Sequence, residues 1–271
     1  MQAIQIARFL AIIFITSCAT ADNQEWHKIE KPLDTKAKVY GSYTAGCIAG
    51  AEFLGNKGDG FISVSNMNRN YGHPELVNII KELSRNIHNQ YDKTLLIGDL
   101  AHPRGGPTSI RTSAHRSHQS GLDVDIWYNF AENDKFEAYS VLNKSRDSIN
   151  KERFGDLQMQ TLKEAAAFNK VERILVNPYV KKSMCNRYNN AKWLNKLRPW
   201  WGHDKHFHVR LKCPASDKSC KKQAPVPNHS GCGKELDWWF SNDAKKTGTK
   251  QNNRKRKFPK LPKQCNDVYL K

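Results

Sequence analysis

Two short segments of this chain alternate strictly between polar and apolar residues, and they constrain the fold more than any other feature. Residues 123–128 read DVDIWY and residues 206–211 read HFHVRL. Successive side chains of a strand point to opposite faces. Each segment therefore predicts a strand with apolar packing on one face and ligand-type side chains on the other: Asp123 and Asp125 in the first strand, and His206, His208 and Arg210 in the second. If the two strands are neighbours in one sheet, these groups can converge.

The rest of the sequence predicts helices and strands interleaved along the chain. Apolar residues recur at helical spacing over 75–87, directly after Pro74, and again over 156–170. Residues 94–98 and 172–176 predict short strands, the second closed by Asn177-Pro178. The segment 102–107 is too rich in Pro and Gly for regular structure, and no internal repeat is visible. We expect a single α+β domain in which a central antiparallel sheet is flanked by helices and long, disulfide-stapled loops.

The N-terminus predicts export. Arg8 precedes an apolar run over 9–15 that is too short for a confident membrane span, and Ala19-Thr20-Ala21 has the small-x-small pattern of a cleavage site. Residues 1–21 are therefore interpreted as a signal peptide. An alternative remains open, because residues 15–18 also resemble a bacterial lipoprotein processing site, which would leave Cys18 as a lipid anchor in the outer membrane.

The cysteines fit an exported chain. Six lie beyond Cys18, and an even number in an oxidising compartment predicts three disulfides, whose pairing the count alone leaves open. A thiolate zinc site is not expected, because the chain has no Cys-x-x-Cys pair.

The chain is strongly basic, with a net charge of +18, and much of the excess lies in residues 241–271. Such a segment, with its Arg254–Lys257 run, is usually a solvated tail and sometimes a nucleic-acid arm. In an exported protein the available polyanions are the cell wall and anionic lipid, so no nucleic-acid partner is expected. A disulfide at Cys265 would tie this tail back to the body.

The polar faces of the two alternating segments suggest a catalytic metal site. His115 and His118 add two imidazoles from the loop before the first strand, which Gly121 allows to turn sharply. Imidazole and carboxylate groups together form a ligand set of catalytic zinc. The two aspartates could instead belong to a solvated strand edge or to a calcium loop. A His-x-His pattern by itself is weak evidence for a pair of metal ligands. The chain has no Gly-x-Ser-x-Gly motif, so the sequence does not indicate a serine nucleophile.

Four segments, 102–107, 113–125, 173–178 and 206–214, carry a resemblance to a known family. They resemble the penicillin-insensitive murein endopeptidases of Gram-negative bacteria. That family belongs to a zinc peptidase group that includes lysostaphin, D-alanyl-D-alanine carboxypeptidases and hedgehog N-domains. The resemblance runs from about residue 41 to about residue 240, which is most of the mature chain.

By this resemblance, His118, Asp125 and His208 would hold a catalytic zinc ion. His206 would be the base or the electrostatic partner of the attacking water. His203 and His115 match further histidines of the family's site, where His203 would be accessory to catalysis and His115 is a candidate additional ligand.

The resemblance also implies the disulfide pairs Cys47–Cys265, Cys185–Cys232 and Cys213–Cys220. In some family members a second metal position uses an Asp and a His three residues apart. Here Asp147 is followed by Asn150, so we expect one catalytic zinc ion and regard a second site as doubtful.

The function implied is that of a periplasmic zinc endopeptidase that hydrolyses the D-alanyl–meso-diaminopimelyl cross-links of peptidoglycan. Its peptidase domain would span residues 22–240, followed by the basic tail. One alternative is a D,D-carboxypeptidase acting on uncross-linked stem peptides. Another is a non-catalytic protein that binds the wall through the tail.

Overall fold

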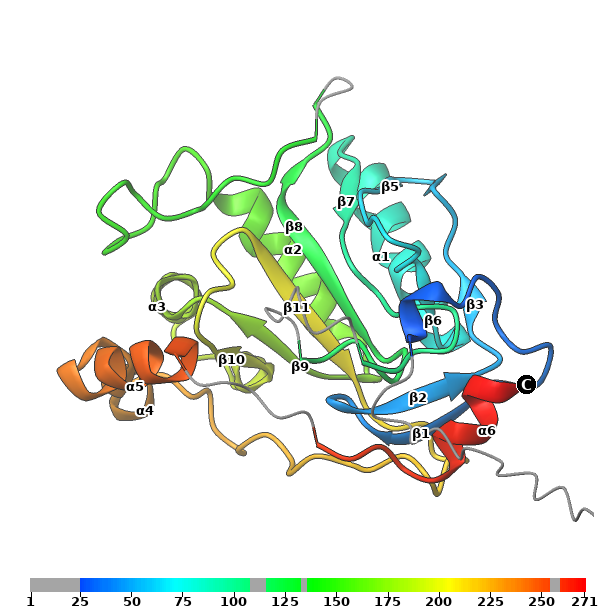
Figure 1. Cartoon of the computed structure of the whole chain (residues 1–271). Coiled ribbons are helices and arrows are strands. Elements are labelled where there is room, and N and C mark those ends of the chain that lie inside the picture. The colour runs from blue at the N-terminus through cyan, green and yellow to red at the C-terminus, as the bar shows by residue number, and fades with distance from the viewer. Residues whose placement is uncertain (1–24, 108–115, 133–135, 254–258) are drawn as a thin grey trace, which may run out of the picture.

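A computed structural model describes residues 25–107, 116–132, 136–253 and 259–271 (Figure 1). Several predicted features lie outside these ranges, namely the signal peptide, Cys18, His115 and the Arg254–Lys257 run.

The chain folds around one mixed sheet of seven strands in the order β10-β9-β11-β8-β7-β5-β4, with two small two-stranded sheets beside it. The strands are β1 (Lys38–Ser42), β2 (Ala45–Ala49), β3 (Glu52–Phe53), β4 (Lys57–Gly58), β5 (Phe61–Ser63), β6 (Tyr71–Gly72), β7 (Leu95–Ile97), β8 (Asp123–Phe130), β9 (Val171–Val176), β10 (Leu197–Pro199) and β11 (His206–Leu211). The helices are η2 (Trp26–Lys28), α1 (Pro74–Tyr91), α2 (Asp156–Ala167), α3 (Pro178–Arg187), η4 (Lys192–Lys196), α4 (Lys234–Asp237), η5 (Trp238–Phe240), α5 (Asn242–Asn253) and α6 (Gln264–Leu270). Helices α1 and α2 lie together on one face of the large sheet (Figure 1).

The centre of the large sheet is antiparallel, as predicted, but two of its outer pairs are parallel. Strands β7, β8, β11 and β9 pair antiparallel, whereas β10 runs parallel to β9 and β5 runs parallel to β7. The predicted antiparallel sheet is therefore the centre of a larger mixed sheet. Parallel neighbours need a crossover, and α3 with η4 forms one between β9 and β10.

The predicted helices form with shifted ends, and the helices α3, α4, α5 and α6 were not predicted. Helix α1 reaches Tyr91, and α2 ends at Ala167, three residues before the predicted end. At the start of α3, Asn177-Pro178 had been interpreted only as the close of the preceding strand. The Asn177 side chain accepts a hydrogen bond from the Tyr179 N–H at 3.0 Å and Pro178 occupies the first turn, so the Asn-Pro pair begins a helix.

Three disulfides staple the loops, in the pairs that the family resemblance implied: Cys47–Cys265, Cys185–Cys232 and Cys213–Cys220. The first joins α6 to β2, and around it Trp26, Leu261 and Val268 form a small buried cluster separate from the main core. The last residues of the chain are therefore packed against the body. The boundary between a peptidase domain and a tail at residue 240 stays a prediction.

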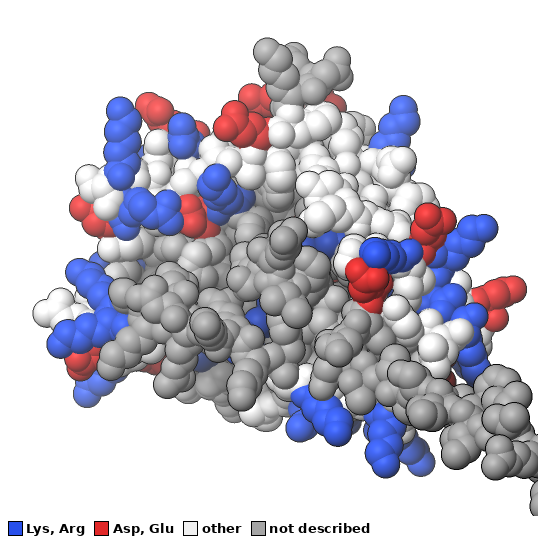
Figure 2. Space-filling view, viewed as in Figure 1, with Lys and Arg blue, Asp and Glu red and all other residues white. Residues whose placement is uncertain are grey.

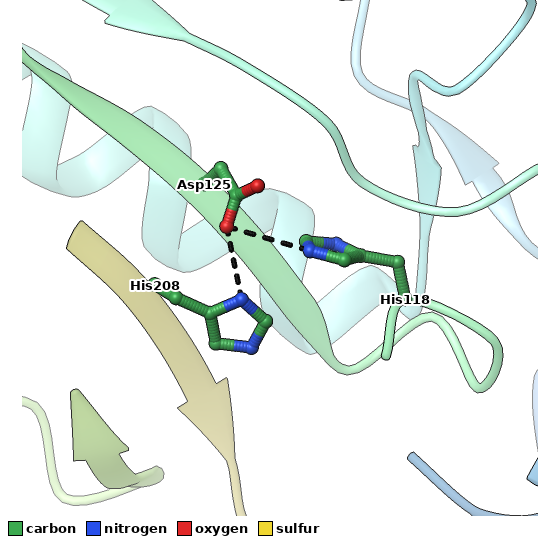
Figure 3. Close-up of side chains that lie close together, drawn as sticks. All are labelled: His118, Asp125 and His208. Carbon is green, nitrogen blue, oxygen red and sulfur yellow. Dashed lines mark hydrogen bonds and ion pairs between the residues drawn. The ribbon is translucent and has the colours of Figure 1, made fainter. Parts of the chain in front are cut away.

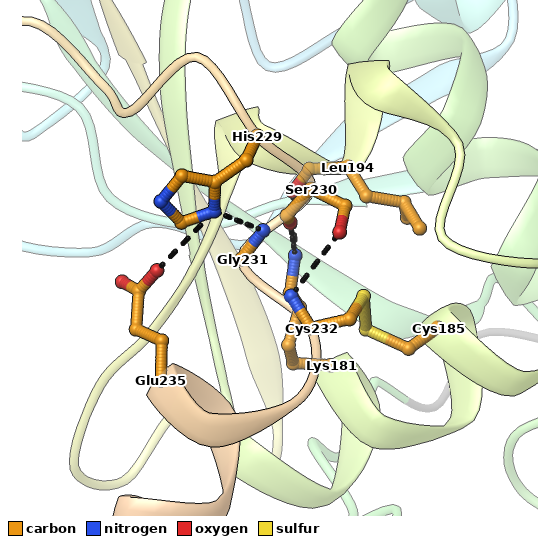
Figure 4. The surroundings of a disulfide bond; sticks show 8 residues. All are labelled: Lys181, Cys185, Leu194, His229, Ser230, Gly231, Cys232 and Glu235. Carbon is orange, nitrogen blue, oxygen red and sulfur yellow. Dashed lines mark hydrogen bonds and ion pairs between the residues drawn. A yellow bond between two sulfur atoms is a disulfide. The ribbon is translucent and has the colours of Figure 1, made fainter.

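A buried amine lies beside the second disulfide (Figure 4). The Lys181 ammonium donates hydrogen bonds to the carbonyl oxygens of Leu194 and Ser230, each at 2.6 Å. Burial, followed by the nearby Arg198 guanidinium, lowers the pKa of Lys181 to about 7. This side chain ties α3 to η4 and to the loop that carries Cys232.

The surface is unevenly charged. In the view of Figure 2, Lys and Arg side chains project from the lower edge with few acidic neighbours, whereas both signs mix elsewhere. Among the described residues, no helix combines the length and apolar character needed to cross a membrane.

Candidate metal centre

The register between β8 and β11 brings the two alternating segments together. His208 pairs with Asp125 across the antiparallel ladder, and Arg210 pairs with Asp123. Directly opposite residues share a face, so the ligand-type side chains of both strands lie on one side of the sheet. The apolar alternates Val124, Ile126, Phe207, Val209 and Leu211 are buried in the core. The predicted convergence is confirmed.

The third member of the cluster comes from the loop before β8. His118 and Gly121 adopt positive φ angles, 68° and 70°, which turn the chain sharply into the strand. Gly121 is held by a 2.8 Å hydrogen bond from the His73 N–H to its carbonyl. The His118 N–H donates to Asp123 Oδ2 at 3.1 Å, so the start of β8 fixes the loop as well.

His118, Asp125 and His208 point toward one another (Figure 3). His208 Nδ1 lies 2.9 Å and His118 Nε2 lies 3.4 Å from Asp125 Oδ1, and one donor atom from each residue falls within 4.8 Å of the others. In a tetrahedral zinc site with ligands at about 2.0–2.1 Å, neighbouring ligand atoms are about 3.3 Å apart. Two imidazoles and one carboxylate at these separations fit a metal ion that keeps a position open for water.

Asp123 supports this cluster from behind, a role that the sequence analysis did not assign. Its fully buried carboxylate lies 2.9 Å from His208 Nε2 and accepts a hydrogen bond from Arg210 Nε at 2.6 Å. Arg210 is itself held by Gln223 and stacks over the Tyr43 ring at 4.3 Å. A carboxylate on Nε2 keeps the proton there and leaves Nδ1 to act as a ligand. The alternation had placed Asp123 and Arg210 on the correct faces, but their contact depends on the register.

The charges of the cluster stabilise one another. Burial alone would raise the pKa of Asp125, but the imidazoles of His206 and His118 outweigh it, and the pKa falls well below its usual range. Burial would likewise raise the pKa of Asp123, and the Arg210 guanidinium with His208 lowers it instead. Both carboxylates are therefore ionised at neutral pH and available as acceptors or ligands.

Two further histidines border the cluster, as predicted. His206 Nε2 lies 3.6 Å from Asp125 Oδ2, and with 20% of its side chain exposed His206 is more accessible than His118 and His208, which also contact this carboxylate. His203 stacks edge-on to His206 with ring centroids 5.3 Å apart. Burial, and then the neighbouring His206 and His208, lowers the pKa of His203 to about 3, so this ring is neutral.

Two residues named in the sequence analysis are not among the described members of this cluster. His115 lies outside the described residues. Asp147 is exposed and hydrogen-bonded to Asn143 within its own loop, and within the described ranges it joins no group of metal-ligating side chains.

Comparison with known proteins gives the family of this chain. The sequence profile of the penicillin-insensitive murein endopeptidases matches residues 39–270. The chain belongs to this family. It is 40% identical over 229 residues to a penicillin-insensitive murein endopeptidase of Haemophilus influenzae, covering 80% of this chain and 79% of that protein. Proteins of the same name from Klebsiella pneumoniae and Salmonella arizonae are each 36% identical, over 84% and 93% of this chain and 86% and 93% of their own lengths.

The match to the penicillin-insensitive murein endopeptidases continues past residue 240, where the sequence analysis had ended the resemblance. The extension includes α6, which carries the buried Cys265 and Val268. The end of the chain therefore belongs to the shared family sequence, including the half of the Cys47–Cys265 disulfide that lies in it.

Proposed function

We propose that this protein is a zinc-dependent endopeptidase that hydrolyses the D-alanyl–meso-diaminopimelyl cross-links of peptidoglycan. The observation that carries the proposal is the buried cluster of two imidazoles and one carboxylate, found in a member of the murein endopeptidase family. The three named relatives are all penicillin-insensitive murein endopeptidases, which supports the substrate class.

His118, Asp125 and His208 would hold the metal. When bound, zinc would supply a Lewis acid that polarises the scissile carbonyl and makes a water nucleophilic near neutral pH. Asp123 orients His208 through Nε2, and the Arg210 guanidinium balances the charge of that second carboxylate. The ligands are therefore held by a fixed framework before substrate arrives.

We assign the proton transfer to His206. Its side chain is partly open to solvent and its Nε2 lies 3.6 Å from Asp125 Oδ2, so a proton accepted on this ring would lie against a carboxylate charge. General base catalysis requires such a group within reach of the reacting water. His203 is neutral and half-buried, and its ring lies edge-on against the His206 ring. No serine would be acylated in this reaction, so β-lactams would not trap the enzyme.

We also place the protein in the periplasm. Three disulfides require an oxidising compartment, and the sequence of residues 1–21 has the features of a signal peptide. The alternative is that the exported protein is anchored to the outer membrane through a lipid on Cys18. The excess of basic residues would attract the anionic wall or anionic lipid, and this attraction would weaken as the salt concentration rises.

The test is metal content together with cleavage of purified cross-linked muropeptides, for the wild type, for His208→Ala and for His229→Ala. His229 is an exposed histidine outside the cluster and serves as the control. We expect about one zinc per chain and conversion of dimers to monomers, both lost only in His208→Ala. Release of terminal D-alanine from uncross-linked stems without dimer cleavage would support a carboxypeptidase instead. Wall binding without zinc or cleavage would leave a non-catalytic protein.

A further inference from the structure

Four tryptophans from two distant segments gather on the surface. Trp200 and Trp201 follow β10, and Trp238 and Trp239 form most of η5. The ring centroids of Trp201 and Trp239 are 4.8 Å apart, those of Trp238 and Trp239 are 5.3 Å apart, and Trp200 lies 6.4 Å from Trp239. Trp200 and Trp238 are each 45% exposed, although an indole is among the most apolar surfaces a side chain can present to water.

The backbone that carries these rings is held rigidly. The Trp200 N–H donates to the Val176 carbonyl at 2.9 Å, and the Asn177 side chain donates to the Gly202 carbonyl at 2.8 Å. The second segment is fixed because Arg198, beside the first pair, forms an ion pair with Glu235 of α4. An aromatic surface that is preorganised loses little conformational entropy on binding.

The cluster continues directly into the metal centre. The Trp201 carbonyl lies 3.0 Å from His203 Nδ1. The His203 ring in turn lies 5.3 Å from the His206 ring and 6.1 Å from the His208 ring, measured between centroids. Trp201 is therefore two residues from a ring that borders the metal centre, so a long ligand bound there can reach the tryptophans.

We propose that Trp200, Trp201, Trp238 and Trp239 form a glycan-binding surface that holds the sugar strand of the murein while its peptide lies at the metal centre. This inference rests on the proposed function. A sugar strand is the expected ligand, because pyranose rings present flat faces of C–H groups that stack on indole faces. The cross-linked peptide would occupy the metal centre. One cationic side chain lies next to this segment, since the Lys182 ammonium is 5.1 Å from the centre of the Phe240 ring, and Phe240 directly follows Trp239. A carboxylate of a stem peptide that branches from the bound sugar strand would pair with this ammonium.

The first experiment measures binding of the N-acetylglucosamine tetramer to the zinc-loaded protein by calorimetry and by indole fluorescence. The tetramer has no peptide bond to cleave, so this measurement does not depend on catalysis. We expect Trp200→Ala and Trp238→Ala to weaken binding about five- to tenfold each, comparable to the loss of one stacked ring in nucleic-acid platforms, and Trp200→Phe to retain most of it. Phe53→Ala removes an equally exposed ring elsewhere, 45% exposed, and should have no effect.

The second experiment compares cross-linked muropeptide dimers with the same dimers after enzymatic removal of their disaccharides. The ratio of kcat/KM between the glycan-bearing and glycan-free substrates should fall about tenfold in the Trp200→Ala, Trp238→Ala double variant. Unchanged tetramer binding and an unchanged ratio in thermally stable variants would overturn the proposal. Loss of retention on anionic vesicles instead of loss of tetramer binding would overturn it in favour of a membrane-facing patch. Failure of the wild type to cleave either dimer would refute the proposed endopeptidase activity. The binding of the tetramer would still test the tryptophan surface independently.

Discussion

Asp123→Asn is the most informative single substitution, because it changes charge and donor pattern with almost no change in shape. Asp123 is fully buried and contacts His208 Nε2, Arg210 Nε and the His118 N–H. An amide has only one acceptor atom for these three partners. If its nitrogen faces His208, the imidazole proton moves to Nδ1, and the lone pair that would bind the metal is lost.

The expected loss can be worked out from these contacts. Removing a group that orients a metal-ligating histidine typically lowers metal affinity 10–100-fold, or about 1.4–2.7 kcal/mol. Breaking a buried ion pair costs about 3–5 kcal/mol of stability. We expect about 3 kcal/mol, the low end of that range, because Arg210 keeps Gln223 and the Tyr43 ring as partners.

Zinc affinity is measured by competition with a fluorescent chelator, and unfolding by urea titration of the same samples. Asp217→Asn is the matched control, since Asp217 is a buried carboxylate that accepts from the Val39 N–H at 2.8 Å in a loop apart from the cluster. It should lose about 1 kcal/mol of stability and no zinc affinity. A folded Asp123→Asn protein that binds zinc within about twofold of wild type would refute the reasoning.

Three further predictions follow from other parts of the structure. Replacing Cys47 and Cys265, which are 218 residues apart, should cost about 5 kcal/mol in urea unfolding, against about 2.5 kcal/mol for Cys213 and Cys220, 7 residues apart, by loop entropy. Burial, and then Arg69, lowers the pKa of His102 to about 4, so stability should fall by about 2–3 kcal/mol as pH drops from 6.5 to 4, and His102→Gln should flatten this slope. Retention on purified walls should decrease steeply with ionic strength, because the charge excess of +18 is screened.

Each of these predictions has a contrary outcome. Equal costs for the two cysteine pairs would contradict the loop-entropy ranking. The sign for His102 follows because the unfolded chain binds its proton below pH 6.5 and the folded chain only near 4. A His102→Gln protein with the wild-type pH slope would therefore contradict its assignment, and His229→Gln provides an exposed control. Salt-independent wall retention would mean that contacts other than charge dominate.

The sequence determined the local features of this protein. Strict alternation defined β8 and β11 and placed Asp125 and His208 on their polar faces, because side-chain direction in a strand depends only on the strand period. Helical spacing after Pro74 located α1, because side-chain direction in a helix likewise depends only on the helical period. The family resemblance, carried by contiguous motifs, named His118, Asp125 and His208 together and the three disulfide pairs that the structure contains.

Only the tertiary structure decided what lies opposite what. The register that sets His208 against Asp125, and Asp123 against His208 and Arg210, depends on packing between residues more than 80 positions apart. The parallel β9–β10 pair required a crossover through α3, whose Asn-Pro start resembles a strand end as much as a helix cap. The tryptophan surface joins two segments whose proximity no local period encodes. Such contacts come from the global packing of the core. A sequence pattern determines which face of an element a side chain lies on, but not which element packs against that face.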